Sequence, residues 1–217
     1  MRPIEVGAVR ITEPATMATD LLIAIICVIF AVDVERAAGS LVSARGLWAL
    51  SFASTAIAAV IGSVVHGFAL HLGVAAKNRL WKATQYAMGL TSLAILAAAI
   101  VAFADGAAQR WLVGLAVAKF AVYAAIVRRR DDYSVVVADY GASMIAMAAL
   151  AIVGWVRSGA AAAPWLVAGV AVSGLAAAVQ VKKVSPHARF NHNDLYHLIQ
   201  IAALYLFYRG GLLFVDG

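Results

Sequence analysis

Seven long apolar stretches, separated by short polar turns, constrain this chain more than any other feature of its sequence. They cover residues 16–34, 47–74, 80–104, 111–127, 133–156, 164–181 and 194–213. Each is close to the ~20 residues that a helix needs to cross a bilayer. The chain is 64% hydrophobic, with a mean hydropathy of +0.90, so a soluble domain would expose apolar surface on every side. The sequence therefore predicts an all-α polytopic membrane protein, with residues 1–217 forming one seven-transmembrane-helix bundle.

The character of these stretches and of the turns between them supports that architecture. Continuous apolar runs without alternation of polar residues argue against a β-barrel. The residues before Thr16 are expected to form a short polar tail, and the first apolar stretch is too long for the alternative, a cleavable signal peptide. Short connections place consecutive helices side by side in antiparallel sense. The single cysteine, Cys27, cannot form an intrachain disulfide and is expected to be a packing residue.

Basic residues are distributed unevenly between the two sides that this topology defines. Of the 17 Lys and Arg residues, eleven lie on the side of the N-terminus: Arg2, Arg10, Lys77, Arg79, Lys82, Arg128, Arg129, Arg130, Lys182, Lys183 and Arg189. Five lie on the other side, and Lys119 lies within an apolar stretch. We therefore expect a cytoplasmic N-terminus and an external C-terminus, in a bacterial inner membrane. Topology and attraction to membrane lipids explain the net charge of +6, so nucleic acid binding is not needed.

Polar and ionisable residues within the apolar stretches gather at one depth. When positions are counted along each helix, most of these residues fall in the leaflet on the N-terminal side, with His66 about two turns inside the second helix. The set comprises Asp20, Ser63, His66, Gln85, Asp139, Gln180, His192, Asn193, Asp194 and His197. A charged group at the centre of a membrane helix costs roughly 2.5–3.5 kcal/mol, so these groups should face one another or a wet cavity. The pattern predicts a polar pocket in the inner leaflet.

Some of these side chains are open to more than one interpretation. Asp139 lies at a similar depth to Lys119 on the neighbouring helix, so it forms an ion pair with Lys119 or turns toward the histidines. His66 either bonds a carbonyl or carboxylate group or binds a metal ion. His71 and His187 are expected at the membrane interface, without a ligand role.

The seventh stretch begins with a dense polar segment, residues 190–200. Asn193, His197, Gln200 and Tyr208 share one face at helical spacing, so we expect them to line the pocket. Asn191 or Asn193 is expected to cap the helix, with Asp194 at the positive end of its dipole. A catalytic zinc ion takes three nitrogen or oxygen ligands and leaves one position for water. His66 and His197, with His192 or Asp194, could supply such a set.

Two short motifs resemble the CREST superfamily of seven-helix membrane proteins. One is Gly62-Ser63-Val64-Val65-His66, with a serine shortly before a histidine; the other is the histidine pair, His192 and His197, in an aromatic setting. The superfamily includes alkaline ceramidases, progestin and adipoQ receptors, and proteins that remodel the lipid of GPI anchors. Its pattern is Ser-x-x-x-His on the second helix and His-x-x-x-His on the seventh. The resemblance implies zinc held by three histidines and hydrolysis of amide or ester bonds in lipids.

The chain departs from that pattern at two positions. Ser63 is one residue closer to His66, and Asn193 stands where the first histidine of the seventh helix belongs. His66 and His197 match. The His-Gly-Phe run at 66–68 and the Asn-His-Asn-Asp-Leu-Tyr-His run at 191–197 are also similar to an uncharacterised bacterial seven-helix family, which implies no function.

Three functions are compatible with these residues. The first is a zinc-dependent hydrolase acting on a lipid amide or ester, in which zinc activates water, Asp139 or Asp20 is the general base and Ser63 bonds the oxyanion. The second is a non-enzymatic protein that binds or transports a proton, a small solute or a lipid, which the departures at Asn193 and Ser63 favour. The third is a b-type haem protein ligated by His66 and His197. Retinal is disfavoured, because the seventh stretch contains no lysine.

Overall fold

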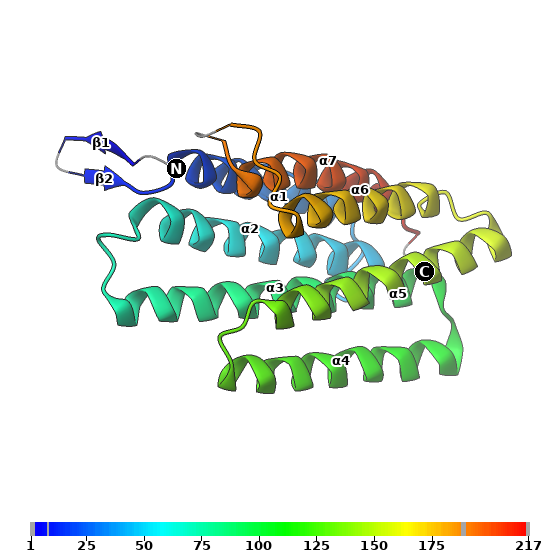
Figure 1. Cartoon of the computed structure of the whole chain (residues 1–217). Coiled ribbons are helices and arrows are strands. Elements are labelled where there is room, and N and C mark those ends of the chain that lie inside the picture. Colours follow the sequence, from blue (N-terminus) through cyan, green and yellow to red (C-terminus); the bar gives the residue numbers. More distant parts are fainter. Residues whose placement is uncertain (1–2, 8, 188–189, 216–217) are drawn as a thin grey trace.

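Seven α-helices, packed as an elongated bundle, make up most of the chain in the computed structural model, which describes residues 3–7, 9–187 and 190–215 (Figure 1). They are α1 (Pro14–Arg36), α2 (Ala44–Phe68), α3 (Val74–Phe103), α4 (Gly106–Arg129), α5 (Ser134–Ser158), α6 (Ala163–Val181) and α7 (His192–Leu212). Consecutive helices run in opposite directions, as the short connections predicted. The predicted all-α class is confirmed. Arg2 and Arg189, two of the residues in the charge comparison, lie outside the described residues.

Six of the described helices, α1 to α6, are long and apolar enough to cross a membrane, which supports an integral membrane protein. Helix α7 has 21 residues and is not among these six. It carries Asp194 in its first turn and Arg209 in its last, which lower its hydropathy. It nevertheless packs along α1 and α6. The seventh span stays a prediction.

The end of α2 differs from its predicted position. We expected this helix to reach residue 74, but it ends at Phe68, and α3 already begins at Val74 after a turn. The turn has an apolar sequence, and hydropathy alone cannot distinguish such a turn from one more helical turn. His66 therefore lies in the last turn of α2, not two turns inside it.

The N-terminal segment is an ordered hairpin, which corrects the expectation of a plain polar tail. Strands β1 (Ile4–Val6) and β2 (Val9–Ile11) pair antiparallel, and Gly7 has a φ of +61°, a conformation that favours glycine at such a turn. Apolar residues alternate on both sides of Gly7, as a strand requires. The segment after β2 is hydrogen-bonded to the end of α2: the Thr12 N–H donates to the Gly67 carbonyl at 2.9 Å. The hairpin thus fixes the start of α1 against the end of α2.

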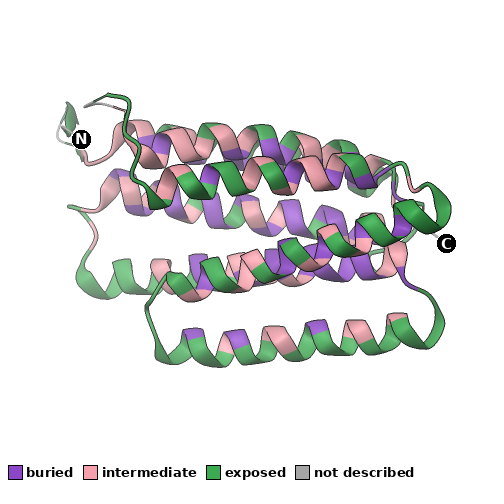
Figure 2. Cartoon of the chain, turned by 45° about the vertical axis from the view of Figure 1, so that its right-hand side comes forward, coloured by how far each residue is buried: buried purple, intermediate pink, exposed green. Residues whose placement is uncertain are grey.

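The buried residues concentrate on α2 and α3, whereas α4 lies at the edge of the bundle and is mostly exposed (Figure 2). At the end opposite the hairpin, Trp48 packs edge-on against Phe52, Phe207 and Phe214, and its indole N–H donates to the Phe207 carbonyl at 3.0 Å. This apolar cluster joins α2 to α7. The polar side chains that sequence analysis singled out lie mainly at the other end.

Candidate functional site

Three helix ends meet at the hairpin end of the bundle: the beginnings of α1 and α7 and the end of α2 (Figure 1). Each contributes polar side chains within its first or last two turns. Two histidines face carboxylates there, His197 facing Asp20 and His66 facing Glu13. This cluster, with the threonines that bind it, is the candidate functional site.

Asp20 and His197 form its buried centre. His197 Nε2 lies 3.4 Å from Asp20 Oδ1, and His197 Nδ1 lies 2.8 Å from the Thr19 hydroxyl oxygen. Asp20 is only 6% exposed, and its second oxygen, Oδ2, has no hydrogen-bond partner among the described residues. A Cβ atom on Gly62 of α2 would lie 3.2 Å from that oxygen. The carboxylate therefore lies directly against the backbone of α2.

The Thr19 hydroxyl can bond His197 in two ways. Its oxygen lies 3.0 Å from the Thr16 carbonyl oxygen and 2.8 Å from His197 Nδ1, so it donates to one of these atoms. If it donates to the carbonyl, Nδ1–H donates to the hydroxyl; if it donates to Nδ1, the hydrogen of the neutral imidazole is on Nε2 and faces Asp20. In both arrangements the contact with Asp20 is favourable only when a proton lies between Nε2 and Oδ1. The imidazole and the carboxyl group are thus placed to share a proton.

Asp194 is a capping residue. Its Oδ1 accepts from the Thr16 hydroxyl at 2.8 Å, and its Oδ2 accepts from the Asn191 N–H at 2.7 Å. The Asn191 side chain accepts in turn from the N–H groups of Asn193 and Asp194, so Asn191 is the N-cap of α7 and the expected cap is present. One Asp194 oxygen thus caps the N-terminus of α7, and the other binds α7 to α1.

His66 and Glu13 form a second pair, closer to the end of the bundle. His66 Nδ1 lies 3.1 Å from Glu13 Oε2, and the two side chains are 28% and 34% exposed. His66 thus bonds a carboxylate, one of the two arrangements open from the sequence. Ser63, the predicted oxyanion donor, lies buried one turn earlier on α2.

The other predicted pocket residues of α7 do not share one pocket with His197. Asn193 accepts from Gln180 of α6 at 2.7 Å, and Gln200 donates to Ser173 of α6 at 3.3 Å. Tyr208 donates to Asp33, at the opposite end of α1. His192 is half-buried, with Nδ1 3.5 Å from the Ser185 hydroxyl. Helix α7 lies between α1 and α6, so its polar residues are divided between two neighbours.

Asp139 and Gln85 belong to a different part of the bundle. Lys119 Nζ of α4 lies 2.5 Å from Asp139 Oδ1 of α5. This ion pair is one of the two arrangements predicted for Asp139. Ser92 of α3 bonds the Lys119 ammonium group at 3.1 Å and the Ser143 hydroxyl at 2.9 Å. Gln85 is fully buried on α3, and the Tyr123 hydroxyl donates to the backbone carbonyl oxygen of Gln85 at 2.6 Å. The role of Asp139 as a general base therefore stays a prediction, without a described contact to the histidines.

The donor arrangement gives no support to zinc. Among the described residues, no group of three or more His, Cys, Asp or Glu side chains is placed to hold a metal ion. Both ring nitrogens of His197 are in contact with α1, and both Asp194 oxygens are hydrogen-bonded. A haem iron would meet the same obstacle at His197. Zinc and haem stay predictions from the sequence.

Sequence analysis missed three contributors to the site: Glu13, Thr16 and Thr19. Glu13, Thr16 and Asp20 follow one another at spacings of three and four residues, and Thr19 follows Thr16 by three, the spacing of one helix face. That stripe was readable at the start of the first apolar stretch. The two threonines are uncharged and Glu13 precedes the stretch, so none of the three is an ionisable group within an apolar stretch.

Comparison with known proteins assigns the chain to a family but gives no activity. No curated protein and no solved structure matches the chain. One family model matches residues 15–215, which include all seven helices except the first residue of α1. The chain belongs to the family of unknown function DUF6962.

Proposed function

We propose that this protein binds and releases a proton at the Asp20–His197 pair and acts as a proton-responsive binding or transport protein of the membrane. The observation that carries the proposal is the position of His197, whose Nε2 faces the buried Asp20 carboxylate at 3.4 Å while its Nδ1 lies 2.8 Å from the Thr19 hydroxyl oxygen. Ionisable groups inside membrane bundles are costly and are typical of proton relays and transport pathways. An imidazole paired with a carboxylate exchanges a proton with a small movement of either group.

The two carboxylate–histidine pairs suggest a route to the buried centre. Glu13 and Asp20 are seven residues apart, about 10 Å along α1, and they lie on the same side of that helix. His66 and Gly62 are one turn apart on α2, facing Glu13 and Asp20 respectively. The half-exposed His66–Glu13 pair would receive a proton from water, and the Asp20–His197 pair would hold it.

The proposal includes the predicted topology. Helix α7 crosses the membrane as a seventh span, and the end that carries both pairs faces the cytoplasm. Packing of α7 between α1 and α6 supports a spanning position, and the Asp194 and Asn191 caps satisfy its first backbone N–H groups. Membrane lipids remain the expected surroundings and possible ligands.

The zinc-dependent lipid hydrolase is the competing proposal from the sequence. It would require His197 to leave Thr19 or Asp20 and a third ligand to approach His66 and His197. Proton binding needs no such rearrangement. Elemental analysis separates the two: stoichiometric zinc that is lost in His197→Ala would favour the hydrolase.

Proton binding is tested by infrared difference spectroscopy and by proton uptake on the purified protein in lipid nanodiscs. The wild type is expected to take up one proton that Asp20→Asn does not, with a carboxyl or carboxylate band that this variant lacks. Glu35→Gln, an exposed carboxylate near the other end of α1, is the matched control and should retain the signal. His197→Gln, which removes the ring but keeps the carboxylate, is a second variant that should alter the same band. An Asp20→Asn protein that is folded and titrates like the wild type would refute the proposal.

A further inference from the structure

A hollow of about 510 Å³ lies between α4 and α5, away from the histidine site. Its apolar lining consists of Val122, Tyr123 and Ile126 of α4 and of Val135 and Ala138 of α5. Val122 is 61% exposed and Ile126 38%, so the hollow opens to the surroundings of the bundle. The Lys119–Asp139 ion pair also lines the hollow.

The end of this hollow nearest the α4–α5 turn carries positively charged side chains. Arg130 and Ser134 line it, and the turn contains Arg128, Arg129 and Arg130 in sequence. Within the described parts of the chain, none of these three arginines takes part in a salt bridge. The hollow therefore has an apolar interior and a cationic rim.

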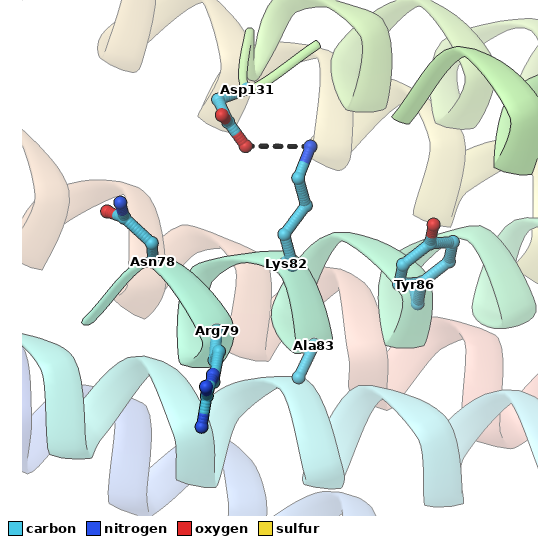
Figure 3. A pocket seen from close by; sticks show the side chains of 6 residues that line it. All are labelled: Asn78, Arg79, Lys82, Ala83, Tyr86 and Asp131. Carbon is cyan, nitrogen blue, oxygen red and sulfur yellow. Dashed lines mark ion pairs between the residues drawn. The ribbon is translucent and has the colours of Figure 1, made fainter. Parts of the chain in front are cut away.

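The two carboxylates of the turn do not cancel this charge. Asp131 is paired with Lys82 of α3 at 2.7 Å, and Figure 3 shows the Lys82 side chain reaching from α3 to that carboxylate. Asp132 accepts from the Ser134 N–H at 2.9 Å and from the Ser134 side chain, and these bonds, with the nearby Arg130 charge, lower the pKa of Asp132, so it stays ionised. Lys82 and the three arginines give four cations against two carboxylates. The net charge of the turn with Lys82 is positive.

Lys82 also fixes the position of the rim. Its ammonium group donates to the backbone carbonyl oxygens of Val127 and of Arg130, the latter at 2.6 Å. These carbonyl groups lie at the end of α4, where they have no hydrogen-bond donor within the helix. The backbone of Arg130 is thus held in place by α3. A second hollow of about 420 Å³, lined by Asn78, Arg79, Lys82 and Tyr86 among others, adjoins this turn (Figure 3).

We propose that the hollow between α4 and α5 binds an anionic phospholipid, with its phosphate at Arg130 and an acyl chain along Val122, Ile126, Val135 and Ala138. Basic pockets between membrane helices suit anionic headgroups, whereas the apolar lining suits hydrocarbon. Charge complementarity selects this occupant over a neutral lipid, which would leave the arginines unpaired. The site is separate from the Asp20–His197 pair and does not depend on the proposed proton binding.

The test is native mass spectrometry of the full chain in detergent, titrated with phosphatidylglycerol and with phosphatidylcholine. Phosphatidylglycerol is expected to bind more tightly, and Arg130→Gln should weaken it about fivefold, as the loss of one surface cation predicts. Val122→Trp, which fills the hollow, should also weaken binding. Val117→Trp, an exposed residue of α4 outside the hollow, and Arg157→Gln, at the other end of α5, are matched controls that should bind as the wild type does.

Several results would overturn the proposal. Equal affinity for the two lipids, unchanged binding by both Arg130→Gln and Val122→Trp, or an equal loss in Val117→Trp would show that the hollow does not select the lipid. Equal competition by soluble glycerol phosphate would show an anion site without a hydrocarbon site. Loss of a dimer in Val122→Trp, with lipid binding unchanged, would assign the hollow to a second copy of the chain.

Discussion

The buried side chain of Gln85 is expected to lower the stability of the protein. It is 0% exposed on α3, and within the described chain neither its amide nitrogen nor its amide oxygen has a hydrogen-bond partner. An unsatisfied buried polar group costs about 1–3 kcal/mol. Gln85→Met keeps the shape of the side chain and removes both polar atoms. We expect it to raise the free energy of unfolding by about 1–3 kcal/mol, measured by denaturant titration in mild detergent.

Gln200→Met is the matched control for this substitution. The Gln200 amide donates to Ser173 of α6, so its removal should lower the free energy of unfolding rather than raise it. A loss of stability in Gln85→Met would show that the amide of Gln85 is hydrogen-bonded in the folded protein, which would contradict the prediction.

Single residues also show how far the candidate site could be read from the sequence. Asp20, His66 and His197 were found because an ionisable group inside an apolar helix is expensive wherever it points. Their partners were not found, because pairing depends on which neighbour each helix face meets. Asn193 and His197 share a spacing typical of one face, but α7 lies between two helices, so Asn193 bonds α6 and His197 contacts α1.

The packing of α6 against α7 depends on a close approach at Gly169. A Cβ atom at this position would overlap the ring of Phe207, which is itself buried. Gly169→Ala should therefore lower the free energy of unfolding by about 1–3 kcal/mol, since overpacking forces side chains or helices apart. Thermal unfolding of the purified protein measures the change.

Gly174 provides the control on the same helix. A Cβ atom there meets nothing within 4 Å, so Gly174→Ala should leave stability unchanged or raise it by up to about 1 kcal/mol through helix propensity. Equal destabilisation by both alanines would mean that the α6–α7 contact at Phe207 does not limit stability.

The helices themselves could be predicted, but some of their ends could not. Long apolar runs determine where a chain must be helical in a membrane, because every backbone group needs a partner there. The end of α2 was misplaced because the turn after Phe68 is as apolar as a helix. The β1–β2 hairpin was missed because its strands are only three residues each, too short for alternation to be decisive.

Both carboxylate–histidine pairs and most of the basic residues lie at one end of the molecule. The Glu13–His66 and Asp20–His197 pairs lie at the end where the α4–α5 turn also lies. The opposite end holds the aromatic cluster around Trp48. If the basic end is cytoplasmic, the Asp20–His197 pair is reached by protons from the cytoplasm, and the α4–α5 hollow opens to the inner leaflet.

This orientation, and the seventh span, are tested together by cysteine labelling in intact cells. Val215 lies just after α7 and is exposed, so Val215→Cys should react with a membrane-impermeant maleimide from outside if α7 crosses the bilayer. Ser40→Cys, between α1 and α2, should react likewise, whereas Ser185→Cys, between α6 and α7, should react only after permeabilisation. The native Cys27 is fully buried, so the unmodified chain should give little background. Labelling at Ser40→Cys with protection at Val215→Cys would show that α7 does not cross the membrane, and labelling at Ser185→Cys alone would reverse the orientation.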